Sequence, residues 1–456
     1  MTKIVIIGGV AAGAKCAAKS RRLLPDAEID LYTQDTHVSY SACGLPYYIE
    51  GNFQDYRQLL VRSPEEFAKD NIFVHLENKV SKILPKSHKI LVENLKNNDA
   101  ELIDYDKLVI ATGARARIPQ IKNSTLKNIF TLRTIEDGIA IKEKVLTSKH
   151  ATIIGSGYIG VEMLEAFVKQ NLRVTLVEQS PYFMPAFDND MSTLILEQLN
   201  SISNDRFKII TNSVVTEFAG DENGVHLVRL SNGQEFETDM VLISAGVIPN
   251  IELASDAGLI IGQTGAIFVT KEMQTSNPDI YACGDCAEKT SLIDGSKIWV
   301  PLGSTANKEG RVAAMNLCGQ EDYFEGILGS AVTRCLGFTI SMTGFTEKKA
   351  IENGFSPVTA TVSKNDKVGY MPDVNNITLK IVADAKTGQL LGGQAVGSGD
   401  ADKRINTLTS ALIAKLSVSE FVSNDLTYSP PFSTTIDPLL NAAQILKSKL
   451  EQANSS

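Results

Sequence analysis

The chain has 456 residues, a formal net charge of −9 and 43% hydrophobic residues, and this length is typical of about three domains. No long basic run interleaves with aromatic residues, which argues against nucleic acid as a partner. No apolar run reaches the ~20 residues that a membrane helix needs. Six cysteines in so long a chain do not make a disulfide framework, so we expect a cytoplasmic protein in a reducing compartment.

The chain opens on a strand and a glycine-rich loop. The apolar run 3–7 leads into Gly8-Gly9-Val10-Ala11-Ala12-Gly13, then into a helix that ends at Pro25 and a strand over 29–33. In this order of elements, backbone N–H groups hold a pyrophosphate. The pattern departs from GxGxxG at Val10, and Thr33 and Gln34 stand where an acidic residue is usual. A chance glycine turn before a helix is the alternative.

One face of that first helix is basic. Lys15, Lys19 and Arg22 fall at helical spacing, so they share a face. They predict a site for an anionic, phosphate-bearing substrate. A solvated basic stripe is the alternative.

A lone cysteine follows in the loop Ser39-Tyr40-Ser41-Ala42-Cys43-Gly44-Leu45-Pro46-Tyr47-Tyr48. We interpret Cys43 as a redox-active thiol facing a flavin. Free cysteine is also among the most buried residue types, so a small core residue is the alternative.

The second nucleotide motif is complete. After a buried strand that ends in Ala111-Thr112-Gly113 and a linker near Pro119, a strand over 151–154 leads into Gly155-Ser156-Gly157-Tyr158-Ile159-Gly160 and a helix. Glu178 ends the next strand, where a carboxylate accepts hydrogen bonds from ribose hydroxyls. Because that carboxylate repels a 2′-phosphate, we expect NADH to be preferred over NADPH.

The remaining motifs are shorter. The strand 240–246 ends at Gly246, and another ends in Gly284-Asp285, which can place a carboxylate on a sugar-alcohol hydroxyl of a flavin cofactor. Cys283 and Cys286 flank that turn as a CxxC without a second pair, so we interpret them as structural and expect no metal site. Tyr370 and Tyr428 lie close to prolines, and a packing role in a fixed loop is the alternative to a functional role. The polar stretch after Leu450 is expected to fray.

Taken together, these motifs resemble the FAD-dependent pyridine nucleotide-disulfide oxidoreductases over nearly the whole chain. The implied fold is α/β, with two Rossmann-like dinucleotide-binding domains, as in glutathione reductase, and a C-terminal α+β dimerisation domain. The expected boundaries are 1–115 and 246–322 for the FAD domain, 116–245 for the NAD(P)H domain and 323–456 for dimerisation. The resemblance also assigns cofactor contacts to Gly246 and Ala306, and it implies a homodimer.

The cysteine loop resembles the single-cysteine branch of this family, because Val38 and Tyr48 stand where a second cysteine would be needed. Oxidase and peroxidase members carry a histidine at the place of Ala11, which argues against oxygen or peroxide as the oxidant. The implied activity is transfer of electrons from NADH through FAD and Cys43 to a small disulfide, persulfide or polysulfide, most of all that of coenzyme A. An NADH oxidase or peroxidase and a non-catalytic, NADH-sensing flavoprotein are the alternatives.

The coenzyme A-disulfide reductases supply the roles of the other residues. By resemblance, Lys15, Lys19, Arg22, Ser39 and Ala42 lie where coenzyme A is contacted, and Tyr370 and Tyr428 of the partner subunit sit by the cysteine as proton donors. Tyr158 resembles the aromatic gate over the flavin. Ala42 replaces an asparagine, and Asn71 and Ile436 stand where lysines are expected, which leaves other small sulfur acceptors open. A nearby flavin and a helix dipole are expected to lower the pKa of the Cys43 thiol.

Overall fold

The first unit is a parallel sheet with the doubly wound order β18-β7-β1-β2-β3. The computed structural model describes residues 1–455 of the chain. The strands are β1 (Lys3–Ile7), β2 (Glu28–Tyr32), β3 (Ile72–His75), β7 (Lys107–Ile110) and β18 (Ile280–Ala282). Apart from the edge strand β3, their near-continuous burial is typical of strands covered on both faces. Because β18 joins the sheet from far along the chain, the first unit is built from two separated segments.

The second unit repeats this design with the order β12-β11-β10-β16-β9. It contains β9 (Ile129–Phe130), β10 (His150–Ile154), β11 (Arg173–Val177), β12 (Phe207–Ile210) and β16 (Met240–Ile243), all parallel. Helix α5 (Tyr158–Lys169) connects β10 to β11. The expectation of two Rossmann-like units is confirmed.

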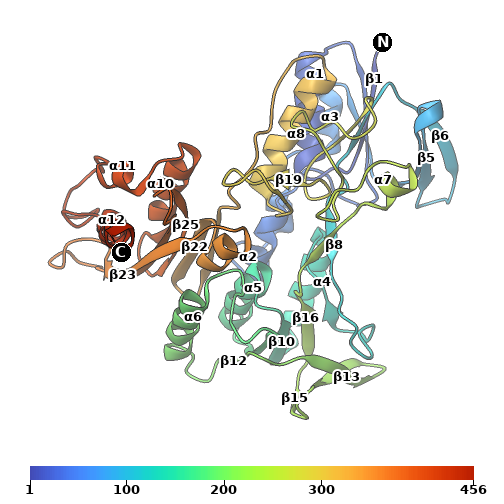
Figure 1. The fold of residues 1–456 in the computed structure, drawn as a ribbon. Coiled ribbons are helices and arrows are strands. Elements are labelled where there is room, and N and C mark those ends of the chain that lie inside the picture. The colour runs from blue at the N-terminus through green and yellow to red at the C-terminus, as the bar shows by residue number, and fades with distance from the viewer. Residues whose placement is uncertain (456) are drawn as a thin grey trace.

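The third unit is an antiparallel sheet with the order β21-β22-β25-β24-β23. The strands are β21 (Ala331–Cys335), β22 (Phe338–Gly344), β23 (Pro357–Asn365), β24 (Asn376–Asp384) and β25 (Leu390–Gly397). Helices α10 (Ala401–Ile413) and α12 (Pro438–Ser455) pack on it. Helix α12 continues past Leu450, where fraying was expected; Ser456 lies outside the described residues. Figure 1 shows the three units as separate lobes that meet near α2 (Leu45–Glu50) and α5.

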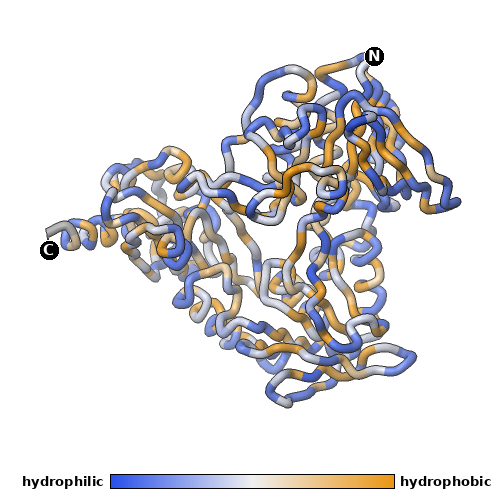
Figure 2. Tube along the Cα trace, turned by 45° about the vertical axis from the view of Figure 1, so that its right-hand side comes forward, coloured by the Kyte–Doolittle hydropathy of each residue, from blue (hydrophilic) through white to orange (hydrophobic). Residues whose placement is uncertain are grey.

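Two short strands mark where the chain passes between the first two units. Strand β8 (Ala114–Ala116) pairs antiparallel with β17 (Val247–Pro249). The outgoing and returning segments therefore lie side by side. Figure 2 shows apolar segments along the interior strands of the units and hydrophilic ones along the outer loops.

The remaining elements are small sheets and helices outside the three large sheets. The small sheets comprise β4 (Asn78–Leu84), β5 (Lys89–Asn94) and β6 (Ala100–Asp104); β13 (Val215–Asp221), β14 (Gly224–Leu230) and β15 (Glu235–Glu237); and β19 (Lys289–Thr290) with β20 (Lys297–Ile298). The other helices are α1 (Ala11–Leu23), α3 (Pro64–Lys69), α4 (Ile135–Val145), α6 (Asn189–Ser201), α7 (Glu252–Asp256), α8 (Gly303–Leu317), α9 (Glu347–Glu352) and α11 (Val418–Val422). Among residues 1–455, no helix has the length and apolarity needed to cross a bilayer.

Helices α1 and α8 pack closely in the first unit because a glycine lies at their contact. A Cβ atom on Gly310 would sit 2.3 Å from the carbonyl oxygen of Ala12. Figure 1 shows the two helices side by side. This contact fixes the start of α8 relative to the first glycine-rich loop.

We predict that Gly310→Ala destabilises the protein although alanine is the better helix former. The added methyl group must push α1 and α8 apart, and overpacking of this kind costs about 1–3 kcal/mol. Urea unfolding should show this loss of free energy, whereas Lys308→Ala, on the exposed face of α8, should not. Equal stability of Gly310→Ala and the unchanged protein would contradict the close contact.

Candidate active site

The loop that carries Cys43 is fastened to the first glycine-rich loop. Cys43 lies in a short 3-10 turn (Ala42–Gly44) that runs directly into α2. The Ser39 N–H donates to the carbonyl of Gly9 at 2.7 Å, and the Ser41 N–H donates to that of Leu59 at 2.9 Å. These bonds bring Ser39 and Cys43, which are far from the glycines in the sequence, to the same edge of the sheet.

The Cys43 thiol faces the start of α8. A Cβ atom built on Gly303 would lie 3.8 Å from its Sγ. Further along α8, the methyl group of Ala306 lies 3.7 Å from the Cβ position of Gly284. The thiol, the start of α8 and the Gly284-Asp285 turn therefore lie in one part of the structure.

The protein groups around Cys43 raise its pKa rather than lower it. Desolvation is the largest cause, followed by the negative charges of Glu162 and Asp285, and Arg133 opposes them. The chain's own groups therefore act against the lowering of the pKa that was expected from a bound flavin and a helix dipole.

Glu162 is a site residue that the sequence reasoning missed. It follows Tyr158 by one turn of α5, its carboxylate accepts a hydrogen bond from Thr333 Oγ1 at 3.2 Å, and burial raises its pKa to about 7. It also raises the pKa of Tyr47. The helical spacing from Tyr158 was the available signal, since both residues then face the same side of α5.

An ion network behind the thiol joins all three units. Glu50, at the end of α2, is bound by Lys169 at 2.5 Å, and the same ammonium binds Glu165 of α5 at 2.7 Å. Arg334, from β21 of the third unit, binds Glu165 at 3.1 Å. Both carboxylates are buried, so each needs these cations.

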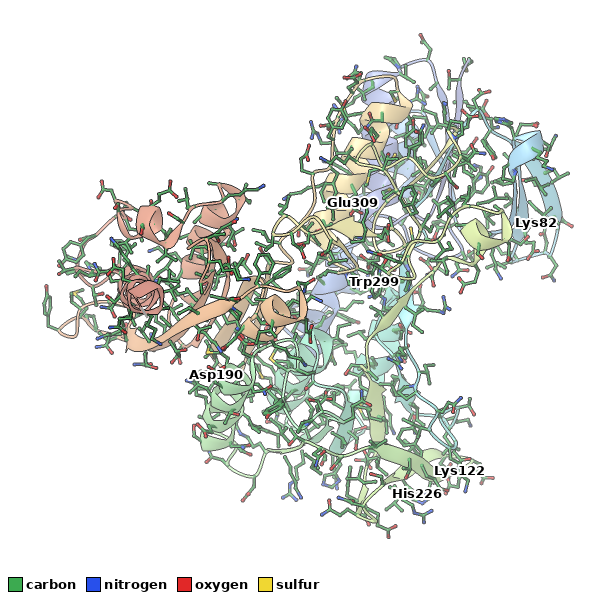
Figure 3. The ribbon with its side chains drawn as sticks, in the orientation of Figure 1. Lys82, Lys122, Asp190, His226, Trp299 and Glu309 are labelled. Carbon is green, nitrogen blue, oxygen red and sulfur yellow. The ribbon has the colours of Figure 1, made fainter. Side chains whose placement is uncertain are left out.

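A second buried ion pair, Glu309 with Lys289, holds the Gly284-Asp285 turn in place. Glu309 of α8 accepts from the Gly284 N–H at 2.7 Å, while Lys289 donates to the Gly284 carbonyl at 2.7 Å. Burial raises the pKa of Glu309 to about 7. Figure 3 labels Glu309 on α8 and Trp299, whose indole N–H donates to the carbonyl oxygen of Asp285 at 2.7 Å. These contacts fix the turn and leave the Asp285 carboxylate an ion pair with Arg133 at 3.4 Å.

The first glycine-rich loop packs tightly against the turn after β7, and that turn has open space at Gly113. Gly8 has φ +104°, and a Cβ atom there would lie 2.2 Å from the Ala111 carbonyl oxygen. A Cβ on Gly113 would meet nothing within 4 Å. Thr33 is buried with its N–H on the His75 carbonyl, and Gln34 is exposed. These residues suit the diphosphate and ribose of FAD.

The second glycine-rich loop is built in the same way. Gly155 has φ +100° and packs on Ser244, whereas a Cβ on Gly157 would meet nothing within 4 Å. Glu178 is buried, and its carboxylate already accepts from the Ser156 N–H and hydroxyl and from the Ser180 N–H, each at 2.8 Å. Oε2 accepts both bonds from Ser156, whereas Oε1 accepts only the one from Ser180 and retains a lone pair for a ribose hydroxyl. Tyr158, at the first turn of α5, is half-buried, and burial raises its pKa.

Among the described residues, Lys15, Lys19 and Arg22 line α1 without a carboxylate partner. Tyr370 and Tyr428 lie on loops of the third unit, 76% and 49% exposed. The groups that act most on the Cys43 pKa do not include either tyrosine. One chain therefore brings the thiol and the nucleotide loops together, but not the two phenols.

Two Rossmann-type units that bring their glycine-rich loops toward an exposed thiol define a dinucleotide-dependent oxidoreductase. The pyridine nucleotide-disulphide oxidoreductase family matches residues 2–310, and its dimerisation domain matches residues 332–439. The chain belongs to this family, and its cofactors are FAD and NAD(P)H.

Particular relatives cover nearly the whole chain. An NAD(P)H coenzyme A polysulfide/persulfide reductase of Pyrococcus horikoshii is 36% identical over 449 residues, 98% of each chain. An NADH oxidase of Methanocaldococcus jannaschii is 34% identical over 452 residues, 98% of this chain and 99% of that one. The structure of an NAD-dependent persulfide reductase from A. fulgidus superposes with a TM-score of 0.95 at 34% identity, covering 99% of this chain and 84% of that one.

We predict that Glu162→Gln lowers the pKa of the Cys43 thiol. Glu162 ionises near pH 7, so its carboxylate is charged over the range in which a thiol titrates, and the substitution removes that repulsion. The pH dependence of Cys43 alkylation, followed by peptide mass spectrometry, measures the change. Glu197→Gln, on the exposed face of α6, is the matched control. An unchanged or higher thiol pKa in Glu162→Gln would show that the Glu162 carboxylate does not repel the thiolate.

Proposed function

We propose that this enzyme uses NADH to reduce the persulfide, polysulfide or disulfide of coenzyme A through FAD and the single redox cysteine Cys43. The observation that carries the proposal is the exposed Cys43 thiol against the start of α8 and the Gly284-Asp285 turn. Cys16, Cys283, Cys286 and Cys335 are buried and Cys318 is half-buried, so none is placed to form a disulfide with Cys43. The free thiols suit the reducing cytoplasm.

The FAD domain, proposed as 1–115 with 246–322, would hold its cofactor through residues from both segments. FAD, when bound, carries an electron pair from NADH to sulfur. Asp285 would accept a hydrogen bond from its sugar alcohol. The other contacts would come from the first loop and neighbouring turns: Gly8, Gly9, Val10, Ala11, Gly13, Thr33, Gln34, Ala111, Thr112, Gly113, Gly246, Gly284 and Ala306.

The NADH domain, proposed as 116–245, would bind its nucleotide with the second loop. Gly155, Gly157, Ile159 and Gly160 would hold the pyrophosphate at the start of α5. Glu178 would accept from the adenosine ribose. Tyr158 would cover the nicotinamide position until NADH enters, because it begins the same helix.

Cys43 carries the sulfur chemistry. Its thiolate attacks a sulfur of the substrate, forming a mixed disulfide and releasing one thiolate. An electron pair from NADH then breaks the mixed disulfide, returning Cys43 to the thiolate and releasing the second thiol. Lys15, Lys19 and Arg22 would bind the phosphates of coenzyme A, with Ser39 and Ala42 beside the reacting sulfur.

The released thiolate needs a proton, and Tyr370 and Tyr428 of the partner subunit would donate it. A phenol is a suitable donor to a thiolate. The two tyrosines, Phe432 and Ile436 are exposed in one chain, as expected of an interface. The proposed dimerisation domain, 323–456, would place them at the partner's thiol.

An NADH oxidase is the second candidate, since the M. jannaschii relative has that name. Oxidase members of the family that the sequence resembles carry a histidine at the position of Ala11. The alanine side chain offers no polar group there. Oxygen uptake that matches NADH consumption, with no thiol product from any sulfur acceptor, would favour the oxidase. Reduction of the flavin without turnover of any acceptor would instead indicate a sensing flavoprotein.

We predict that Cys43→Ser abolishes the reduction of oxidised coenzyme A and of coenzyme A persulfide while NADH still bleaches the flavin. Serine cannot form the mixed disulfide, whereas the NADH site is unaltered. Steady-state thiol release and stopped-flow absorbance separate the two steps. Cys318→Ser serves as the control, and survival of both activities in Cys43→Ser would refute the proposal.

We predict that Glu178→Gln lowers the preference for NADH over NADPH by about tenfold, or about 1.4 kcal/mol. The substitution removes the charge that repels a 2′-phosphate but keeps one acceptor oxygen. The ratio of kcat/KM values for the two nucleotides measures it. An unchanged ratio, or equal efficiency with both nucleotides before any substitution, would contradict the role of Glu178.

A further inference from the structure

Two loops of the third unit carry the exposed tyrosines. Residues 366–375 join β23 to β24 and contain Tyr370, and residues 423–437 join α11 to α12 and contain Tyr428. The loops are separated by 47 residues of sequence, 376–422. Neither a disulfide nor a shared strand holds them together in the described chain.

One buried side chain, Arg404, binds the loop that carries Tyr370. Arg404, in the first turn of α10, is 2% exposed, and its Nη2 donates to the carbonyl oxygen of Asp366 at 2.9 Å. Asp366 closes the loop, because its carboxylate accepts from the Asn375 N–H at 2.9 Å and its own N–H donates to the Asn375 carbonyl at 2.8 Å. The base of the Tyr370 loop is thus attached to α10.

The same guanidinium holds the second loop. Its Nη2 and Nε lie 3.0 and 3.2 Å from Oδ2 of Asp437. That oxygen also accepts from the buried Ser433 hydroxyl at 2.9 Å, and Oδ1 accepts from the Leu439 N–H at 2.9 Å at the start of α12. The remaining nitrogen, Nη1, donates to the Asp400 carbonyl at 3.2 Å.

A planar guanidinium with fixed donors can hold two loops in one register, which a lysine ammonium cannot do. We propose that Arg404 is a positioning residue that sets Tyr370 and Tyr428 relative to each other, so that both phenols reach one thiol of the partner subunit. This inference rests on the proposed function, in which the two tyrosines act at that thiol. Arg404 itself touches neither substrate nor cofactor.

The test compares the FAD-loaded dimers of Arg404→Lys, Asp437→Asn and Lys403→Met, the last an exposed neighbour on α10. Hydrogen exchange of peptides from 366–375 and 423–437 measures the loops directly. We expect faster exchange in both loops for the first two variants and an unchanged exchange rate for Lys403→Met. Turnover of oxidised coenzyme A should fall about tenfold or more, while NADH reduces the flavin at the unaltered rate.

A second set of variants separates positioning from general damage. In a Tyr370→Phe/Tyr428→Phe background, Arg404→Lys should cause no further loss of turnover, because its effect passes through the phenols. An additive loss, or unchanged exchange of either loop in Arg404→Lys, would overturn the inference. If the double phenylalanine variant instead turns over normally, the proposed role of the tyrosines fails, while the exchange result still decides whether Arg404 holds the loops.

Discussion

Two buried carboxylates behind the thiol hold the site together. Glu50 ends the helix that follows Cys43, and Glu165 lies on the helix that follows the second glycine-rich loop. Lys169 binds both carboxylates, and Arg334 from β21 of the third unit binds Glu165. Lys169 and Arg334 each lie near both carboxylates, so removing one cation would leave two buried negative charges with a single positive one, which is destabilising. The relative placement of the cysteine, the NADH site and the dimerisation domain therefore depends on this network.

The electrostatics of the site have a direct consequence for its chemistry. The polypeptide alone disfavours the Cys43 thiolate, because desolvation, Glu162 and Asp285 all act against it. A reactive thiolate then needs further stabilisation, for example the hydrogen bonds that the proposed phenol donors of the partner subunit would supply.

The fold and the local motifs were predictable from sequence because they are local patterns. Gly8 and Gly155 require positive φ at tight turns, and buried strands read as apolar runs. Glu162, Lys289, Glu309 and Arg404 were missed because their roles depend on contacts between distant elements. Arg404, for example, binds groups at positions 366 and 437, and no spacing in the sequence reveals that. The effect of Glu162 and Asp285 on the pKa of Cys43 was missed for the same reason, since both approach it only in the folded chain.

The central claim is that Cys43 is the cysteine through which an electron pair from NADH reaches the sulfur of the substrate. Mass spectrometry of the Cys43 peptide, after exposure to oxidised coenzyme A without NADH, tests it most directly. The account predicts a mass increase equal to one coenzyme A on Cys43, lost after NADH is added. An unmodified Cys43 in an enzyme that turns over, or an adduct that persists through NADH oxidation, would contradict it.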